Sequence, residues 1–516
     1  MSVMAQTMLP AMAPYHAALR QAGRGDIGGA LGSLERLIEA DPTYAPAYRR
    51  YAGLADATGQ GGRVDAFLQT MAAGSVYGHY GLAVAAANRG NAAGVVLGHI
   101  EPVIRARPDF LPGLLVWNRT LLRLKQIDQG LDYYRVRAQD DVTRFAAHHL
   151  RAWSSGRSVD DLEQLAAISR THRHRREFTE AWLLAEYARF STHHRALEAV
   201  RQVSGFAAEA GDDDLGNYAA SLGADLLYHS GAVRDAAVLA ERVAATSREL
   251  GDHAAEVDML YRLCMARRTL GDLAEARRSC AECVRRGEAT TKPASTLSDA
   301  WASLAWIDIS AGDMQAGLAS LKTAAAWATS SSFPTLPAIR RLDLAEALFQ
   351  LGQRSEAEAA ARRELALFEK SGSQTEVLLN GLLARCLAAR GDAAGARLLF
   401  AKATDAARQS GNHLLEQQLL TEAGLAALAA GQTVEARESL ILALAKAREH
   451  EDARSLQALL TGLGPRGAAS GRSRRGSGPI RRSAPNRGRL VVGGRLRAWT
   501  GGRARRRACR RSASLP

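Results

Sequence analysis

The chain has 516 residues, of which 47% are hydrophobic and only 6% aromatic, so its core must be built mainly from alanine and leucine. No run approaches the roughly 18 apolar residues of a membrane span, and five unevenly placed cysteines do not make a disulfide framework. The apolar N-terminus has no basic residue ahead of its apolar part and is interrupted by Pro10 and Pro14, which disfavours an export signal. We therefore expect a cytoplasmic protein in a reducing compartment that does not enter a membrane.

A repeating helix-turn-helix pattern begins near the N-terminus. Leu34 and Leu37 follow a Gly25-Asp26 turn at helical spacing, and Pro42 closes the second helix. Similar turns follow along the chain at intervals of about 30 to 41 residues, which indicates about twelve helix hairpins. The turns are predicted near Gly25, Gly59, Gly90, Gln126, Gly156, Ser191, Gly231, Gly271, Gly312, Gly352, Gly391 and Gly431.

The second half has the most regular repeat. From Gly231 to Gly431 the turn glycines recur every 39 to 41 residues, and a small residue precedes each glycine by seven positions. Alanine occurs five residues after each of these glycines, except in one repeat, where the residue is Gly317. The small residue before the turn and the small residue after it are expected to face each other, which suits a tightly packed hairpin. The alanines are Ala236, Ala276, Ala357, Ala396 and Ala436, and the earlier small residues are Ala224, Cys264, Ala305, Ala345, Ala384 and Gly424.

A second set of breaks separates successive hairpins about half a period away from these turns. Helices of about 15 to 17 residues fit between consecutive breaks, and no sustained alternation predicts a strand. Such short helices depend on stacking for stability. The breaks are Gly211-Asp212, Gly251-Asp252, Lys292-Pro293, Ser330 to Pro334, Ser371-Gly372 and Gly411-Asn412.

These residues resemble the tetratricopeptide repeat, most sharply at Ala18, Gly25-Asp26, Ala30, Leu34, Leu37 and Asp41-Pro42. The resemblance implies an all-α, right-handed α-solenoid of about twelve stacked hairpins. The longer repeats resemble those of bacterial signalling ATPases, transcription activators and CHAT-type proteins. We expect N-terminal repeats in 1–140 with a period of about 34 residues, degenerate helical repeats in 141–210, repeats of about 40 residues in 211–463, and a disordered tail in 464–516.

The resemblance also implies that the first helix of each hairpin lines a concave face that binds a peptide. Residues 3, 6 and 10 positions before the turn glycine would face it, and they mix aromatic, methionine and charged side chains. An alternative is that Ile309, Leu342 and Phe349 belong to the hairpin core. The predicted groove residues are Ser221, Asp225, Tyr228, Tyr261, Met265, Arg268, Trp306, Glu346 and Arg385.

The last 53 residues differ in charge from the rest of the chain. Residues 464–516 contain 16 arginines and no lysine or acid, while the whole chain has a formal net charge of +14. Rich also in Gly, Ser and Pro, this tail is expected to be disordered. One interpretation is that it binds nucleic acid or an acidic surface through its arginines. The other is that it results from a frameshift in a GC-rich coding sequence, in which case a downstream domain is missing.

Other candidates for chemistry are weaker. Cys280-x-x-Cys283 has the spacing of half a zinc site or of a redox pair. It lies on a predicted helix without a second CxxC or a nearby CxxH, so core packing is the simpler interpretation. The neighbours in His148-His149 and His193-His194 point about 100° apart on a helix, so neither pair can chelate as an i,i+4 pair would. The stretch 171–176 is basic, either as a solvated linker or as a site for an acidic or phosphate partner. Asp212-Asp213-Asp214 is interpreted as a helix N-terminus rather than a cation site.

No catalytic, nucleotide-binding or metalloprotease motif occurs in the chain, so we predict no enzyme activity, cofactor or metal here. The leading hypothesis is a protein-protein interaction scaffold. A second is the sensor or regulatory arm of a multidomain protein, such as a CHAT-type protease or a signalling ATPase, that is truncated in this chain. A third is a nucleic-acid-binding regulator that uses the arginine-rich tail.

Overall fold

The computed structural model describes residues 11–137, 139–154, 158–188, 193–290, 294–331, 336–368 and 373–449, which form 24 helices and no strand. The helices of the first half are α1 (Met12–Gly23), α2 (Ile27–Ala40), α3 (Ala45–Ala57), α4 (Gly61–Ala72), α5 (Val76–Asn88), α6 (Ala93–Ala106), α7 (Leu111–Leu124), α8 (Ile127–Arg135), α9 (Asp141–Ser154), α10 (Val159–Thr171), α11 (Arg176–Tyr187) and α12 (His193–Ala210). Those of the second half are α13 (Asp213–His229), α14 (Val233–Glu249), α15 (His253–Thr269), α16 (Leu273–Glu288), α17 (Ala294–Ser310), α18 (Met314–Thr329), α19 (Leu336–Gln350), α20 (Arg354–Phe368), α21 (Gln374–Arg390), α22 (Ala393–Gln409), α23 (His413–Ala429) and α24 (Thr433–Glu449).

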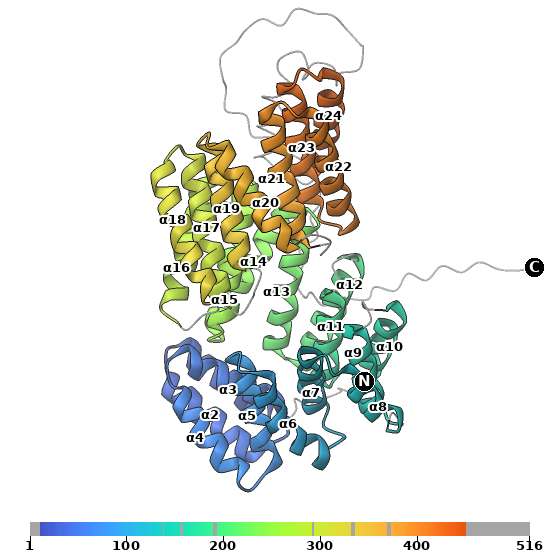
Figure 1. Ribbon diagram of the computed structural model, residues 1–516. Coiled ribbons are helices and arrows are strands. Elements are labelled where there is room, and N and C mark those ends of the chain that lie inside the picture. The colour runs from blue at the N-terminus through green and yellow to red at the C-terminus, as the bar shows by residue number, and fades with distance from the viewer. Residues whose placement is uncertain are drawn as a thin grey trace, which may run out of the picture. The chain divides into compact units, whose positions relative to one another are not determined.

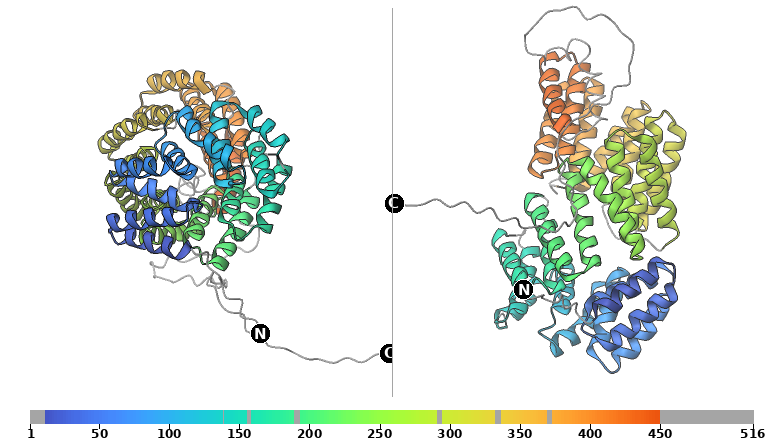
Figure 2. Two further views of the ribbon diagram at one scale, coloured as in Figure 1. Left: turned by 90° about the horizontal axis from the view of Figure 1, so that it is seen from below. Right: turned by 180° about the vertical axis from the view of Figure 1, so that it is seen from behind.

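Each odd-numbered helix packs against the even-numbered helix that follows it, and the resulting hairpins stack on one another (Figures 1 and 2). This confirms the predicted all-α stack of twelve hairpins. None of the helices in the described ranges is long and apolar enough to cross a membrane. The predicted turns at Gly156 and Ser191, the breaks at Lys292-Pro293, Pro334 and Ser371-Gly372, and the tail 464–516 lie outside the described residues.

The glycine turns have the left-handed conformation that the sequence predicts. From Gly231 to Gly431 the six turn glycines have φ between 76° and 93°, a region that other residues seldom adopt. Aspartates after these glycines cap the next helix, as where the Asp392 carboxylate accepts a hydrogen bond from the Gly395 amide at 2.9 Å. The turn predicted at Gln126 differs in detail, because Lys125 takes the left-handed position with φ of 59°.

The small residues lie where the two helices of a hairpin cross. All five predicted alanines of the second helices are at most 4% exposed, and the paired small residues of the first helices are also buried. At Gly317 a methyl group would lie 2.4 Å from Ile309 Cγ1 and 3.0 Å from the Ala305 carbonyl oxygen. Close backbone approach therefore requires a small side chain at both positions.

Replacing Ala396 with phenylalanine is expected to lower the free energy of unfolding by about 1 to 3 kcal/mol, because the ring has no space at the helix crossing. The measurement is urea unfolding followed by circular dichroism. Leu398→Phe on the same helix is the control, because Leu398 is 71% exposed and its replacement should change stability by less than about 0.5 kcal/mol. Equal stability of the two variants would place Ala396 away from the crossing.

An unexpected feature is a set of charges, most of them buried or half-buried, that joins hairpins distant in the sequence. We call it the ionic cluster. Asp214 at the start of α13 accepts a hydrogen bond from Tyr15 of α1 at 2.9 Å, pairs with Arg50 of α3, and lies 2.7 Å from Arg176 of α11. Its members are Tyr15, His16, Arg49, Arg50, Arg176, Glu180, Asp212, Asp214 and Asp252.

Backbone packing reinforces this contact. A methyl group added at Gly23, at the end of α1, would lie only 2.0 Å from the carbonyl oxygen of Glu249 at the end of α14. Gly251 is equally confined, because a methyl group there would lie 2.5 Å from the Ala22 side chain. The first hairpin therefore contacts the seventh directly, in addition to the neighbour-to-neighbour stacking of a solenoid.

Electrostatics favour the ionised form of the cluster. Burial alone would raise the pKa of the Glu180 carboxyl, but Arg49 and Arg176 outweigh burial and lower this pKa to about 2. Arg50 and Arg176 likewise hold the pKa of Asp214 far below its usual range despite burial. Both carboxylates thus stabilise the folded state above the ordinary carboxyl pKa of about 4, and this contribution is lost as the pH falls toward 2.

Asp214→Asn is expected to weaken the contact between the first and seventh hairpins by about 3 to 5 kcal/mol, because Arg50 and Arg176 are left buried without their shared partner. Native-state amide hydrogen exchange in α1 and α3 measures this local loss. Asp405→Asn removes an exposed pair with Arg408 and should leave exchange in α1 and α3 unchanged. Unaltered exchange in the Asp214 variant would contradict the role given to the cluster.

Candidate functional site

The first helices of six successive hairpins line a pocket of about 540 Å³, which we call the inner pocket. Tyr261, Met265 and Trp306 supply large apolar surfaces, while arginines and aspartates supply charge. Each of the helices α13, α15, α17, α19, α21 and α23 contributes at least one residue, with Asn412 capping the last. The lining residues are Tyr228, His229, Tyr261, Arg262, Met265, Arg268, Thr269, Asp299, Ala302, Ser303, Trp306, Ile339, Arg340, Asp343, Thr375, Leu378, Asn412, Leu414, Leu415 and Gln418.

Five of the nine predicted groove residues line this pocket: Tyr228, Tyr261, Met265, Arg268 and Trp306. Ser221, Asp225, Glu346 and Arg385 do not line it, although they lie on the same series of first helices. None of the nine is fully exposed, and Asp225 and Tyr228 are buried. Their assignment to a binding groove stays a prediction.

Three of the residues outside the pocket pair with neighbouring first helices. Asp225 accepts a hydrogen bond from Tyr187 at 2.7 Å and pairs with Arg262. Glu346 on α19 pairs with Arg385 on α21, which also lies 3.6 Å from Glu422 on α23. These ion pairs connect successive hairpins, so the charged side chains stabilise the stack of hairpins.

The predicted alternative, that three apolar residues belong to the hairpin core, agrees with the structure. Ile309 and Leu342 are buried, and Ile309 packs with Ala305 and Leu321 of its own hairpin. Phe349 packs against the cluster that contains Leu342 and Ala345, and Arg385 lies over its ring at 5.0 Å from the centroid. These side chains therefore support the hairpins and do not line the inner pocket.

The pocket holds charges that the sequence did not single out. Arg340 lies 3.0 Å from Asp299 and 3.2 Å from Asp343, and it also donates to the Ser298 carbonyl oxygen at 3.3 Å. Burial raises the pKa of both carboxyls above the usual range, in spite of the opposing charge of Arg340. Burial also lowers the pKa of Arg262 to about 10. The charged wall of the pocket is therefore poorly solvated, which strengthens its interaction with a bound polar group.

The helical period could have indicated the pocket residues that the sequence analysis did not predict. Residues 13 positions before the turn glycine lie one further turn along the same stripe, and they include Asp299, Ile339, Leu378 and Gln418. Residues nine positions before the glycine also line the pocket, as Arg262, Ser303 and Asp343 do. The stripe that faces the pocket is thus wider and longer than the three predicted positions.

The expectation about the cysteines is wrong in one respect. Cys264 of α15 and Cys280 of α16 form a disulfide across their hairpin, so the cysteine pattern gives no argument for a reducing compartment. Cys283 is a free buried thiol, as the core-packing interpretation predicts, and burial raises the pKa of this thiol well above its usual range. The described residues contain no group of three His, Cys, Asp or Glu side chains that could hold a metal ion.

The remaining predicted clusters have structural partners. Asp212 caps α13 by accepting a hydrogen bond from the Leu215 amide at 3.0 Å, as predicted for this aspartate run. His148 lies 2.7 Å from Asp161, while His149 is buried and its pKa is lowered by burial to about 3. The side chains of His193 and His194 lie outside the described residues. Most of the basic stretch 171–176 is paired within the chain.

The chain was compared with protein families, with curated proteins and with solved structures. The sequence matches no family model and no curated protein. One similar structure is from the crystal structure of the APC/C hetero-tetramer Cut9-Hcn1, with 14% identity, a TM-score of 0.40, and 87% of this chain and 88% of that chain covered. A second is from a Rap protein complexed with competence and sporulation factor, with 12% identity and a TM-score of 0.39. The match covers 65% of this chain and 95% of that chain.

A third similar structure is a putative kinesin light chain with nearly identical TPR-like repeats from Podosopora anserina, with 21% identity, a TM-score of 0.27, and 37% of this chain and 93% of that chain covered. All three TM-scores are below 0.5. The stack of helix hairpins is established by the helix bounds, turns and contacts described above.

Breaking the Cys264–Cys280 disulfide is expected to lower the free energy of unfolding by about 2 to 4 kcal/mol, because the bond constrains a short loop of the unfolded chain. Urea unfolding with and without a reductant measures the loss. A Cys264→Ala, Cys280→Ala double variant is the control, since its stability should not respond to the reductant. Alkylation of the unreduced, denatured protein at Cys264 and Cys280 would show that the two thiols are not paired.

Proposed function

We propose that the chain is a protein-protein interaction scaffold that binds an extended segment of a partner protein in the inner pocket. The observation that carries the proposal is the convergence of six first helices on one pocket that combines aromatic, methionine and charged side chains. Surfaces of this composition favour peptide binding, because aromatic and methionine side chains anchor apolar groups while a few charges fix orientation.

The arrangement of the pocket suits an extended chain. Successive first helices each present a short stripe, so a bound segment contacts several hairpins in turn, from α13 to α23. Tyr261, Met265 and Trp306 come from two adjacent hairpins and supply anchors for an apolar side chain. Asp299, Arg340 and Asp343 lie beside them and supply acceptors and donors for polar groups of the bound segment.

Binding in this pocket also fits the stability of its walls. Tyr261, Met265 and Trp306 are half-buried and also pack against the hydrophobic clusters of their own hairpins. Their half-buried positions mean that a ligand covers surface that is already partly ordered, which lowers the entropic cost of association. We therefore expect truncation of one anchor to weaken binding without unfolding the repeat.

Trp306→Ala is expected to weaken binding of a partner peptide at least about tenfold, because the variant loses a large aromatic anchor that lines the pocket. The partner is first identified by cross-linking and capture with the full chain, and its binding segment is then titrated as a synthetic peptide. Far-UV circular dichroism should show unchanged helicity.

Trp327→Ala is the matched control, since Trp327 lies on α18 of the same hairpin and does not line the inner pocket. The control should bind the peptide as the unaltered chain does. Equal loss of binding in both variants would point to a general weakening of the hairpin, and equal retention would place the interface elsewhere.

A further inference from the structure

A second and larger cavity lies among the first six hairpins, away from the residues of the inner pocket. It has a volume of about 710 Å³, within the range of small-molecule sites, and we call it the N-terminal pocket. Helices α3, α5 and α7 form one side, and α9 and α11 the other. The proposed scaffold function assigns it no role, and His174, Arg175 and Arg176 of the basic stretch 171–176 line it.

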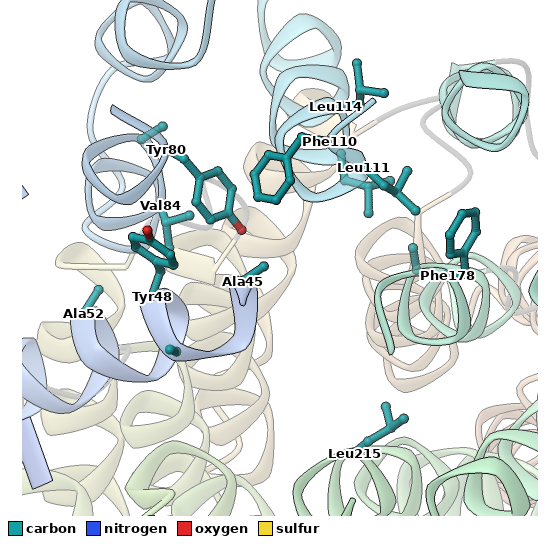
Figure 3. Close-up of a cluster of buried hydrophobic side chains, with 14 of the residues drawn as sticks. Ala45, Tyr48, Ala52, Tyr80, Val84, Phe110, Leu111, Leu114, Phe178 and Leu215 are labelled. Atoms are coloured by element: carbon teal, nitrogen blue, oxygen red, sulfur yellow. The ribbon is translucent and has the colours of Figure 1, made fainter. Parts of the chain in front are cut away.

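Much of the wall of the N-terminal pocket is apolar. The Tyr80 and Phe110 rings meet edge to face at 5.0 Å between centroids, and Figure 3 shows them side by side where α5 approaches the start of α7. Leu115, Val116 and Val142 add aliphatic surface. An apolar or aromatic body of a ligand therefore has a surface on which to pack.

The acidic groups at this pocket have partners within the chain. Asp109 lies 2.8 Å from Arg107, and Glu177 lies 2.6 Å from Arg175. Glu180 is held by Arg49 and Arg176, and Asp41 accepts a hydrogen bond from the Thr43 hydroxyl at 2.6 Å. The hydrogen bond from Arg107 lowers the pKa of Asp109, which keeps that carboxylate ionised and paired. No acid at this pocket lacks a partner, so the site does not call for a cationic ligand.

In contrast to the acids, some hydrogen-bond donors that line the N-terminal pocket have no partner within the described residues. The Tyr80 hydroxyl makes no hydrogen bond with a described residue. Burial raises the pKa of this phenol, so the hydroxyl remains protonated and able to donate. Arg119 lines the same pocket, is exposed, and forms no ion pair with any described residue.

We propose that the N-terminal pocket binds a small organic anion with an aromatic or aliphatic body. The anionic group pairs with Arg119 and accepts a hydrogen bond from the Tyr80 hydroxyl, while the body packs against Phe110, Leu115 and Val116. A neutral ligand of the same shape leaves Arg119 without a counter-charge. A cationic ligand is repelled by Arg119 and finds the carboxylates already paired.

The test compares three probes that share one aromatic body: naphthoate, naphthylmethanol and naphthylmethylammonium. Isothermal titration of the full chain should show naphthoate binding at least about tenfold more tightly than naphthylmethanol, a difference of about 1.4 kcal/mol, with the ammonium probe weakest. Equal affinities for the three probes would overturn the proposal, as would the absence of saturable naphthoate binding.

The tail holds 16 arginines, which attract anions whether or not the pocket binds one. Single substitutions in the pocket are therefore needed to show where naphthoate binds. Arg119→Gln should reduce the affinity for naphthoate to that for naphthylmethanol, and Tyr80→Phe should weaken naphthoate binding about threefold to tenfold. Arg123→Gln is the matched control, since Arg123 is an exposed arginine on the same helix that does not line the pocket. Equal effects of Arg119→Gln and Arg123→Gln would overturn the assignment.

A cavity-filling variant tests the site without changing its charge. Val116→Trp should abolish binding of all three probes while far-UV circular dichroism stays unchanged. Trp306→Ala in the inner pocket should leave naphthoate binding intact, so that failure of this proposal and failure of the scaffold proposal are distinguishable. Full binding of naphthoate by a folded Val116→Trp variant would place the anion elsewhere on the chain.

Discussion

Close approach of two helix backbones at a crossing of small residues is the constraint on which the rest of the structure depends. Even a methyl group at Gly317 would collide with Ile309, and alanine at the equivalent positions of the other long repeats is buried. Helices of 15 to 17 residues have little stability alone, so they persist only when such crossings allow each hairpin to cover the next. The left-handed glycine turn fixes the direction in which the second helix returns.

Local signals explain why most of the fold could be predicted from the sequence. Gly231 and Gly391 require positive φ, Asp392 caps the next helix, and Ala396 lies at the crossing; each property depends on neighbours a few residues away. Lys125 shows the limit of this approach, because a lysine gives no conformational signal for the left-handed region that it occupies. The turn was therefore predicted one residue too late.

Contacts between distant repeats could not be predicted in the same way. Tyr15 and Asp214 are 199 positions apart, and no periodic pattern links them. The aspartates at 212 and 214 were correctly placed at a helix start, but their pairing with Arg176 and Arg50 depends on how far successive hairpins turn. The predicted groove has the same limitation: the helical period indicated the face, whereas the pairing of Glu346 with Arg385 depends on the distance between two hairpins.

The ionic cluster and the N-terminal pocket share residues, and this has a thermodynamic consequence. Arg49, Arg176 and Glu180 line the pocket, and the same three side chains belong to the set of charges that joins α3 and α11 to α13. A ligand that binds only when these three side chains are paired as in the folded structure also stabilises the contact between the first and seventh hairpins. By linkage, the free energy by which the ligand stabilises this contact equals the free energy by which the contact strengthens ligand binding. The inner pocket begins at the other end of α13, with Tyr228 and His229, so one helix carries the distant contact at its start and the proposed peptide site at its end.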